Sequence, residues 1–165
     1  MEIINKIEAS GIQTLYLRSY KPNENDFIQF DIVPFLIEDF LLQEKTFRQQ
    51  MANIDWNQYS GKEVVICCSN DAIVPLWSYV LIASLLTPHV ATVVYSTTGN
   101  HINLLWIERI RKIEFTAFMN QKIVLKANNA IPEEILVFAT SQLIKYVQTL
   151  MWGEAGSPLM IYKRK

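Results

Sequence analysis

Cysteine is scarce in this sequence of 165 residues, which contains only Cys67 and Cys68. Adjacent residues of a strand point to opposite faces, so these two thiols are poorly placed to bridge each other. Two cysteines also exclude the disulfide framework that stabilises many small secreted proteins. The first residues, Met1–Lys6, lack the charged start and long apolar segment of a signal peptide. We therefore expect a protein of the reducing cytoplasm.

Net charge is small as well, because 15 Lys and Arg residues nearly balance 16 Asp and Glu residues. The chain has no basic field for nucleic acid and no acidic tail. Between Asp71 and Glu108 there is no charged side chain at all. A membrane span needs about 20 continuous apolar residues, whereas the apolar run Leu76–Leu86 is shorter and Thr87-Pro88-His89 interrupts it. We expect neither a nucleic-acid partner nor a membrane span.

The most informative stretch is Cys67–Trp77, which predicts the end of a buried strand, a polar loop and the start of a helix. Val64–Ile66 is apolar and β-branched, as a strand covered on both faces requires. Pro75 suits the first helical position, and the residues before it are of types that cap helices. Such a junction leaves free backbone N–H groups that favour an anion.

This junction occurs twice, because the sequence repeats itself weakly. Each repeat is a strand, a capped loop, a helix that starts at proline, and a second strand. An amphipathic helix over Ile102–Phe118 is predicted between the repeats. The matched positions are Val65-Ile66 with Val124-Leu125, Asn70 with Asn129, Pro75 with Pro132, Val90 with Val147, Thr92 with Thr149, and Tyr95 with Trp152.

Alternation of strands and helices predicts an α/β three-layer sandwich with a mainly parallel central sheet built from the two strand-helix-strand repeats. We expect one domain over residues 1–165, with an N-terminal portion (1–58) and a duplicated body (59–165). The N-terminal portion is predicted to extend an edge of the sheet with a hairpin and to add helices. Its expected elements are a helix over Glu2–Ala9, strands over Ile12–Leu17 and Phe27–Ile32, and a helical segment over Phe35–Phe40 that continues over Gln43–Asn53.

A candidate ligand site follows from this topology. Right-handed crossovers favour the strands that begin at Lys62 and Lys122 as neighbours, so their capped loops would meet at the carboxyl edge of the sheet. Two helix N-termini there would favour a small anionic ligand. The competing interpretation is that the polar residues only cap their own helices. The candidate residues are Cys68, Ser69, Asn70, Asp71, His101, Asn128, Asn129 and Glu154.

These residues do not identify a reaction or a cofactor. A nucleophilic Cys68 would need an arginine nearby to hold an oxyanion, and none lies between Cys68 and Arg109. No histidine or cysteine pair has the spacing of metal ligands, so we expect no tightly bound metal.

Two classes of function remain open: a ligand-binding or enzymatic α/β protein, and a non-catalytic homo-oligomeric interaction protein. The second is suggested by the predicted helix Leu76–Leu86, whose only polar residues are Ser78 and Ser84. Either the N-terminal portion or a second subunit must cover this helix. A second subunit would make the protein a homodimer.

The string Cys68–Trp77, with Gly153-Glu154 and Tyr162-Lys163 near the end, resembles an uncharacterised bacterial family, domain of unknown function 2480. The resemblance covers the whole chain, and its most specific part is the Cys-Ser-x-Asp-Ala-x-Val-Pro pattern. It implies a fold and no activity. The family pattern continues from Gly-Glu through one residue to Cys-Ser, whereas Gly156 holds that cysteine position here. A cysteine-pair or metal role in the family would therefore not extend to this chain.

Overall fold

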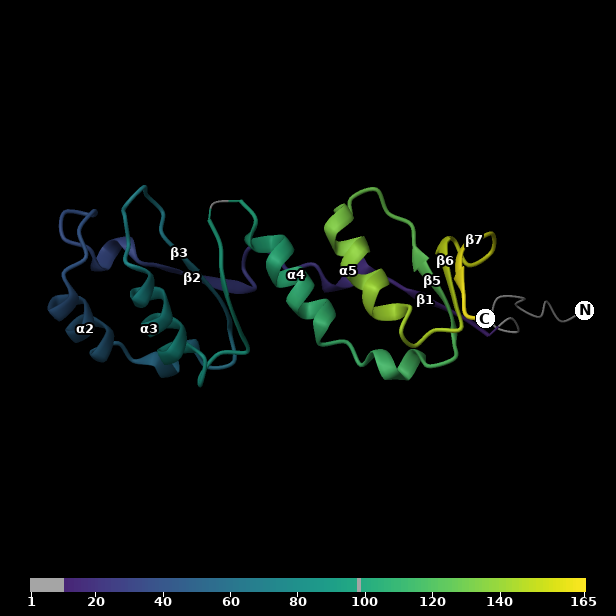
Figure 1. Cartoon of the computed structure of the whole chain (residues 1–165), viewed down its shortest axis with the longest axis horizontal. Helices are drawn as coiled ribbons and strands as arrows, with labels where there is room; N and C mark the ends of the chain where they lie inside the picture. Colours follow the sequence, from purple (N-terminus) through teal and green to yellow (C-terminus); the bar gives the residue numbers. More distant parts are fainter. Residues whose placement is uncertain (1–10, 98) are drawn as a thin grey trace, which may run out of the picture. The chain divides into compact units, whose positions relative to one another are not determined.

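Figure 1 shows the computed structural model of the chain, which describes residues 11–97 and 99–165. The helix predicted over Glu2–Ala9 lies outside the described residues. The chain forms two compact units. Unit 1 comprises Met1–Lys21 and Trp106–Lys165, and unit 2 comprises Pro22–Leu105. In the sequence, unit 2 is therefore inserted into unit 1.

Unit 2 is built on a parallel sheet of β2 (Phe27–Asp31), β3 (Glu63–Cys67) and β4 (Thr92–Tyr95), in that order. The apolar run Val64–Ile66 in the central strand is at most 3% exposed, as a strand covered on both faces requires. The helix α2 (Glu44–Ala52) precedes β3 in the chain, and α3 (Leu76–Leu86) connects β3 to β4.

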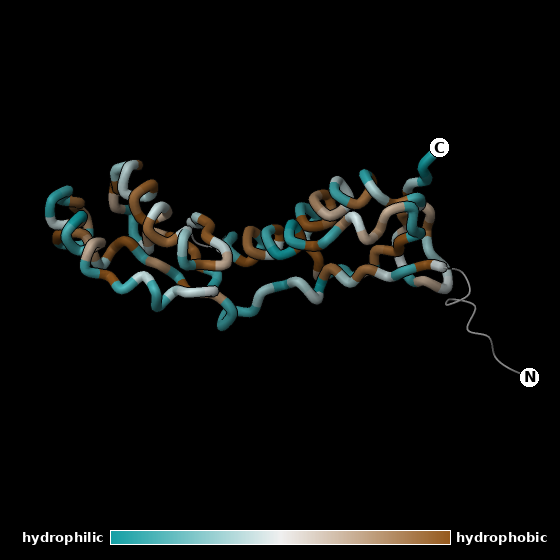
Figure 2. The backbone as a smooth tube through the Cα atoms, turned by 90° about the horizontal axis from the view of Figure 1, so that it is seen from below, coloured by the Kyte–Doolittle hydropathy of each residue, from teal (hydrophilic) through white to brown (hydrophobic). Residues whose placement is uncertain are grey.

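Helices pack on both faces of this sheet. On one face, Val64 and Ile66 form a core with Phe47 of α2 and Ile82 of α3. On the other face, Val65 packs with residues at the start of α4 (His101–Arg111). Figure 2 contrasts α2, which is largely hydrophilic, with α3, which is largely hydrophobic. Unit 2 is therefore a three-layer arrangement.

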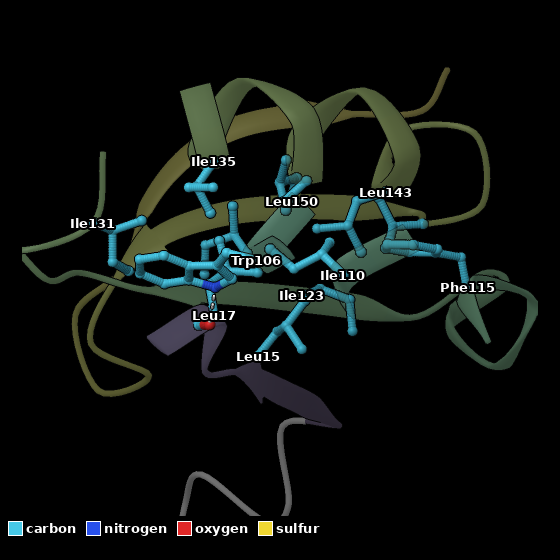
Figure 3. Close-up of a cluster of buried hydrophobic side chains, with 13 residues drawn as sticks. Leu15, Leu17, Trp106, Ile110, Phe115, Ile123, Ile131, Ile135, Leu143 and Leu150 are labelled. Carbon is cyan, nitrogen blue, oxygen red and sulfur yellow. Dashed lines mark hydrogen bonds between the residues drawn. The ribbon is translucent and has the colours of Figure 1, made fainter. Parts of the chain in front are cut away.

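Unit 1 has a sheet in the order β1-β5-β6-β7. The first three strands are parallel, and β7 runs antiparallel to β6. The helix α5 (Glu133–Leu143) connects β5 to β6 and packs with the second part of α4 on one face of the sheet (Figure 3). The strands are β1 (Ile12–Leu15), β5 (Lys122–Lys126), β6 (Thr149–Gly153) and β7 (Leu159–Lys163).

The two units follow one plan: strand, 3₁₀ helix, α-helix, 3₁₀ helix, strand, α-helix, strand. The same backbone geometry precedes the second strand of each. Gly61 and Asn120 have positive φ angles of 70° and 59°, and their N–H groups donate to the carbonyls of His89 and Tyr146. Unit 1 alone continues into a further strand, β7.

The predicted α/β class, with mainly parallel strands and two strand-helix-strand repeats, is confirmed. The helix Leu76–Leu86 has the predicted bounds. The division at Pro22 and Leu105 does not coincide with the internal boundary predicted after residue 58. The single domain over residues 1–165 stays a prediction. Among the described residues, no helix is long and apolar enough to cross a membrane.

The pairing of the strands differs from the prediction. The strands Ile12–Leu15 and Phe27–Asp31 belong to different sheets instead of forming a hairpin, because each is the first strand of its own unit and pairs in parallel with that unit's second strand. For the same reason β3, which follows Lys62, and β5, which begins at Lys122, belong to different sheets. They are not the neighbours in one central sheet that were predicted.

Two predicted helical segments are also shorter than expected. The helix predicted over Ile102–Phe118 ends at Arg111 and is followed by a separate 3₁₀ helix. Most of Phe35–Phe40 forms a turn, in which Glu38 and Asp39 have positive φ angles of 50° and 63°. The turn is held from a distant part of unit 2, because the side-chain amide of Asn70 donates to the Asp39 carbonyl at 2.6 Å.

Candidate functional site

The carboxyl ends of β3 and β4 form a crevice in unit 2. The connection that follows β3 leads to α3 on one face of the sheet, and the connection that follows β4 leads to α4 on the other. Neighbouring parallel strands whose connections leave toward opposite faces create the usual ligand position of open α/β sheets. The switch point therefore lies between β3 and β4. It does not lie between β3 and β5, the two strands that were predicted to be neighbours.

A small hollow occupies this crevice, and we call it the polar hollow. Its volume is about 140 Å³. It contains three of the eight predicted site residues: Cys68, Ser69 and His101. The other lining residues come from β2, from β3 and from the segment that follows β4. The complete lining is Gln29, Val65, Cys67, Cys68, Ser69, Ser96, Thr97, Gly99 and His101.

His101 is the first residue of α4 and brings both a side chain and a helix N-terminus to the polar hollow. Its imidazole packs against the Phe27 ring with the ring centres 5.2 Å apart. The buried Nε2 atom finds no hydrogen-bond partner among the described residues, although a Glu24 carboxylate oxygen lies 3.8 Å away. The N–H groups in the first turn of a helix such as α4 have no acceptor within the helix itself. The His101 imidazole and the first turn of α4 can therefore hydrogen-bond a ligand at this end of the polar hollow.

Ser69 is held at the rim by Asp31, at the end of β2. The Asp31 carboxylate accepts hydrogen bonds from the Ser69 N–H at 3.1 Å, from the Ser69 hydroxyl at 2.5 Å and from the Val33 N–H at 3.1 Å. These bonds tie the loop that follows β3 to the end of the neighbouring strand. Sequence reasoning missed this role of Asp31, although a carboxylate at the end of a strand was the available signal.

Asn70 holds the shape of the loop. Its Oδ1 accepts from the Ala72 N–H at 2.9 Å and from the Cys68 thiol at 3.3 Å, while its amide donates to Asp39. Asp71 is exposed and does not line the polar hollow. In this loop, Cys68 and Ser69 face the hollow, and Asn70 supports the backbone that carries them.

Both cysteines are free and both line the polar hollow. Burial raises the pKa of the Cys67 thiol, and the nearby Asp31 carboxylate and Cys68 raise it further. A thiol with a raised pKa is protonated at neutral pH and is a weak nucleophile. The surroundings of Cys67 therefore favour a neutral hydrogen-bonding group over a reactive thiolate.

The remaining predicted site residues lie in unit 1. Asn128 Oδ1 accepts from the Ala130 N–H at 2.9 Å, which is the same turn that Asn70 makes, so Asn128 and not Asn129 is the counterpart of Asn70. Asn128 lines a hollow of about 400 Å³ with Arg18 and Lys126 among its other residues. Glu154 forms an ion pair with Lys126, and Asn129 is exposed. The eight predicted residues therefore do not share one hollow.

Within residues 11–97 and 99–165, no group of three or more His, Cys, Asp or Glu side chains is arranged to hold a metal ion. The polar hollow instead presents hydroxyl, thiol, imidazole and amide groups. These groups bind ligands by hydrogen bonding.

Comparison with known proteins gives a family and no activity. No curated protein and no solved structure matches the chain. Residues 1–164 match a family described as protein of unknown function (DUF2480). Because the match covers nearly the whole sequence, the chain belongs to this family of unknown function.

Proposed function

We propose that the protein binds a small anionic ligand in the polar hollow of unit 2. The observation that carries the proposal is the buried Nε2 atom of His101, which is without a hydrogen-bond partner among the described residues and belongs to a side chain that lines the hollow. A buried polar atom left unsatisfied costs about 1–3 kcal/mol, so a ligand that bonds to it recovers that cost.

The chemistry of the lining favours an anion over a cation. The imidazole of His101 can donate a hydrogen bond to an anion from a ring nitrogen. The N-terminus of α4 adds the positive end of the helix dipole. The oxygens of Asp31 already accept three hydrogen bonds from Ser69 and Val33, so they are engaged with protein donors.

The volume restricts the size of the ligand. Pockets for drug-sized ligands are typically about 300–1,000 Å³, whereas the polar hollow has about 140 Å³. Inorganic phosphate, sulfate or a short carboxylate suits this space better than a nucleotide. The reducing cytoplasm that we propose as the location keeps both lining thiols available as weak donors.

Nuclear magnetic resonance tests the proposal directly, because the sequence has only two histidines. His101 lines the polar hollow, and His89 lies before β4, at the opposite end of the strands. We expect titration with inorganic phosphate, sulfate or succinate to move the imidazole Cε1–H signal of His101 and to leave that of His89 unchanged. Equal movement of both signals, or of neither, would contradict the proposal.

Calorimetry on three variants sharpens the test. We expect one site with a Kd of about 1 mM or tighter, which corresponds to about 4 kcal/mol. His101→Gln should weaken binding roughly tenfold or more, because hydrogen bonds to charged groups contribute about 1.5–3 kcal/mol. His89→Gln is the matched control and should bind like the parent. Glu24→Gln should tighten binding, because it removes the carboxylate that lies 3.8 Å from Nε2.

A further inference from the structure

A second hollow of unit 2 repeats one in unit 1, and we call it the apolar hollow. It lies between α3 and β4, and its counterpart lies between α5 and β6. Both strand pairs have the same register, with Ile66 opposite Tyr95 and Leu125 opposite Trp152. Six matched positions line the two hollows: Ile66 and Leu125, Tyr79 and Leu136, Ala83 and Thr140, Val93 and Leu150, Val94 and Met151, and Tyr95 and Trp152.

The seventh lining residue differs between the units. In unit 1 it is Ile161, which belongs to β7, the strand paired antiparallel with β6. In unit 2 it is Val80 of α3 itself. Among the described strands, β4 pairs only with β3 and has nothing in the place that β7 takes beside β6. Unit 1 thus shows which kind of element completes this hollow: an antiparallel strand.

The loop before α3, the helix α3 and the end of β4 carry exposed hydrophobic side chains. Ile73 is 93% exposed, Leu76 82%, Val80 70% and Tyr95 50%. The position of Leu76 at the start of α3 corresponds to that of Glu133 at the start of α5, so unit 1 carries a charged residue where unit 2 carries an exposed leucine. Leu76 and Val80 lie one turn apart on the same face of α3, and exposed apolar side chains gathered in this way favour an interaction surface.

On the side of β4 that faces away from β3, no other described strand pairs with it. The Ser96 N–H donates to the Ile66 carbonyl of β3. Because N–H groups alternate in direction along a strand, those of Val93 and Tyr95 point to the free edge. Edge strands are usually protected by charged residues, proline or a bulge, but Thr92–Tyr95 contains neither a charged residue nor a proline.

We propose that a second copy of the chain completes unit 2, with β4 pairing antiparallel with β4 of the partner subunit across a twofold axis. A twofold contact places residues near the axis opposite their own copies, so like charges there would repel. The segment between Asp71 and Glu108, which contains both α3 and β4, has no Asp, Glu, Lys or Arg. Self-pairing joins the two sheets of this type into six strands and brings Leu76 and Val80 of the two α3 helices together.

The free-edge N–H groups and the bounds of β4 together select the register of the pairing. We infer the register that pairs both Val93 and Tyr95 within the bounds of β4: Val93 lies opposite Tyr95 of the partner subunit in a hydrogen-bonded position, and Val94 lies on the axis. Residues in a non-hydrogen-bonded antiparallel pair have Cα atoms about 4.5 Å apart, which is within the range of a disulfide. The register therefore makes a prediction that cross-linking can test.

Sedimentation of the full chain tests the dimer itself. We expect a species of twice 19.1 kDa at micromolar concentration. Leu76→Glu, which copies the residue type of unit 1, and Val80→Glu should each give a folded monomer by circular dichroism. Val137→Glu is the matched control, because Val137 holds the corresponding position on α5 and is 69% exposed; it should remain a dimer. A monomeric parent, or a dimer that survives both unit 2 substitutions, would overturn the proposal.

Cross-linking then tests the geometry. In a background of Cys67→Ala and Cys68→Ala, we expect Val94→Cys to form a disulfide-linked dimer under mild oxidation and Val93→Cys to remain unlinked. Linking through residue 93 and not 94 would overturn the proposed register. The apolar hollow and the polar hollow have no lining residue in common. Loss of the dimer should therefore leave phosphate binding at His101 unchanged, which separates the two proposals.

Discussion

Units 1 and 2 share a backbone plan but differ where their last parallel strands end. In unit 1 the chain turns after β6 and returns as β7, which pairs with the sheet. In unit 2 the chain leaves β4 for α4, on the other face, and this change of direction creates the polar hollow. Among the described strands, the same plan therefore yields an edge that β7 covers in one unit, and an uncovered edge beside the polar hollow in the other.

The two units also differ in the chemistry at matched positions. Lys126 in unit 1 pairs with Glu154 and lines a hollow with Arg18. Cys67 holds the corresponding place at the end of β3, near Asp31. Backbone hydrogen bonds and the buried apolar faces preserve the plan, so the strand ends are free to carry different side chains. The backbone plan that the two units share therefore determines where a site can lie, whereas the side chains at the strand ends determine its chemistry.

The largest expected effect concerns the core of unit 1. Trp106 is 1% exposed, and its indole N–H donates to the Leu17 carbonyl at 2.9 Å (Figure 3). Trp106→Ala should lower the free energy of unfolding by about 3–5 kcal/mol, because it leaves a large cavity. Urea denaturation followed by circular dichroism measures the loss.

A conservative control separates packing from hydrogen bonding at this site. Trp106→Phe keeps most of the apolar volume but leaves the Leu17 carbonyl unpaired, which should cost about 1–3 kcal/mol. In unit 2, Trp56 makes the corresponding kind of bond to the Met51 carbonyl at 3.1 Å. Equal losses for Trp106→Ala and Trp106→Phe would contradict the cavity argument.

The next prediction makes unit 1 resemble unit 2. A chain that ends at Gly156 lacks β7, which removes Ile161 from its hollow and Tyr162 from contact with the core. Losing the burial of these side chains should lower the free energy of unfolding by roughly 3 kcal/mol. The exposed β6 edge should also produce species larger than a dimer in sedimentation. A truncated chain with unchanged stability would show that β7 does not protect the sheet.

Much of this fold could be predicted from the sequence, because local patterns carried it. The helix Leu76–Leu86 was found with its bounds, since an apolar run between Pro75 and Thr87-Pro88 leaves little choice. The strand-loop-helix-strand repeats were found from matched residue types. The pairing of the strands was not predicted correctly, because hydrophobic periodicity and strand propensity do not indicate which two strands are neighbours in a sheet. Ile12–Leu15 and Phe27–Asp31 follow one another in the sequence but start different units.

The candidate site shows the same limit. Cys68, Ser69 and His101 were predicted together and do line one hollow. The counterpart of Asn70 was placed one residue late, because a shorter loop in unit 1 obscures the match until the turn that Asn128 makes is seen. Asp31 was missed, since its role depends on Ser69, which lies 38 residues away in the sequence. The strand β7 was missed too, although Leu159–Lys163 follows Pro158 with apolar residues.

A third prediction concerns the thiol that unit 1 lacks. Burial, then Asp31, then Cys68 raise the pKa of Cys67, so its thiolate fraction at pH 8 should be smaller than that of an unfolded chain. In a Cys68→Ser variant, native protein should react with iodoacetamide at least several-fold more slowly than urea-unfolded protein. The ratio of the unfolded rate to the native rate should fall as the pH rises through the raised pKa of Cys67, because the native thiol then ionises.

The pH dependence separates a raised pKa from limited access of iodoacetamide to the buried thiol. Limited access alone would keep the ratio of unfolded to native rate constant as the pH changes. Asp31→Asn should speed the native reaction by removing the neighbouring negative charge. The same linkage acts on stability: the contribution of the neutral Cys67 is present below the ordinary thiol pKa of about 8.5 and is lost as pH rises through the folded value. A native rate equal to the unfolded rate at pH 8 would be incompatible with a raised pKa.

The smallest expected effect compares the matched turns of the two units. Asn70 and Asn128 each accept a hydrogen bond at 2.9 Å from the N–H two residues later. Asn70 also donates to the Asp39 carbonyl at 2.6 Å and thereby holds the turn of Glu38 and Asp39. We expect Asn128→Ala to cost about 0.5–1 kcal/mol and Asn70→Ala to cost about 1 kcal/mol more, since a typical hydrogen bond contributes about that much. Urea denaturation of both variants measures the difference, and Asn70→Asp, which keeps the acceptor but loses the amide donor, should fall between the parent and Asn70→Ala. If Asn128→Ala cost as much as Asn70→Ala, the tie to Asp39 would contribute nothing, and the two loops would be equivalent in stability as well as in backbone shape.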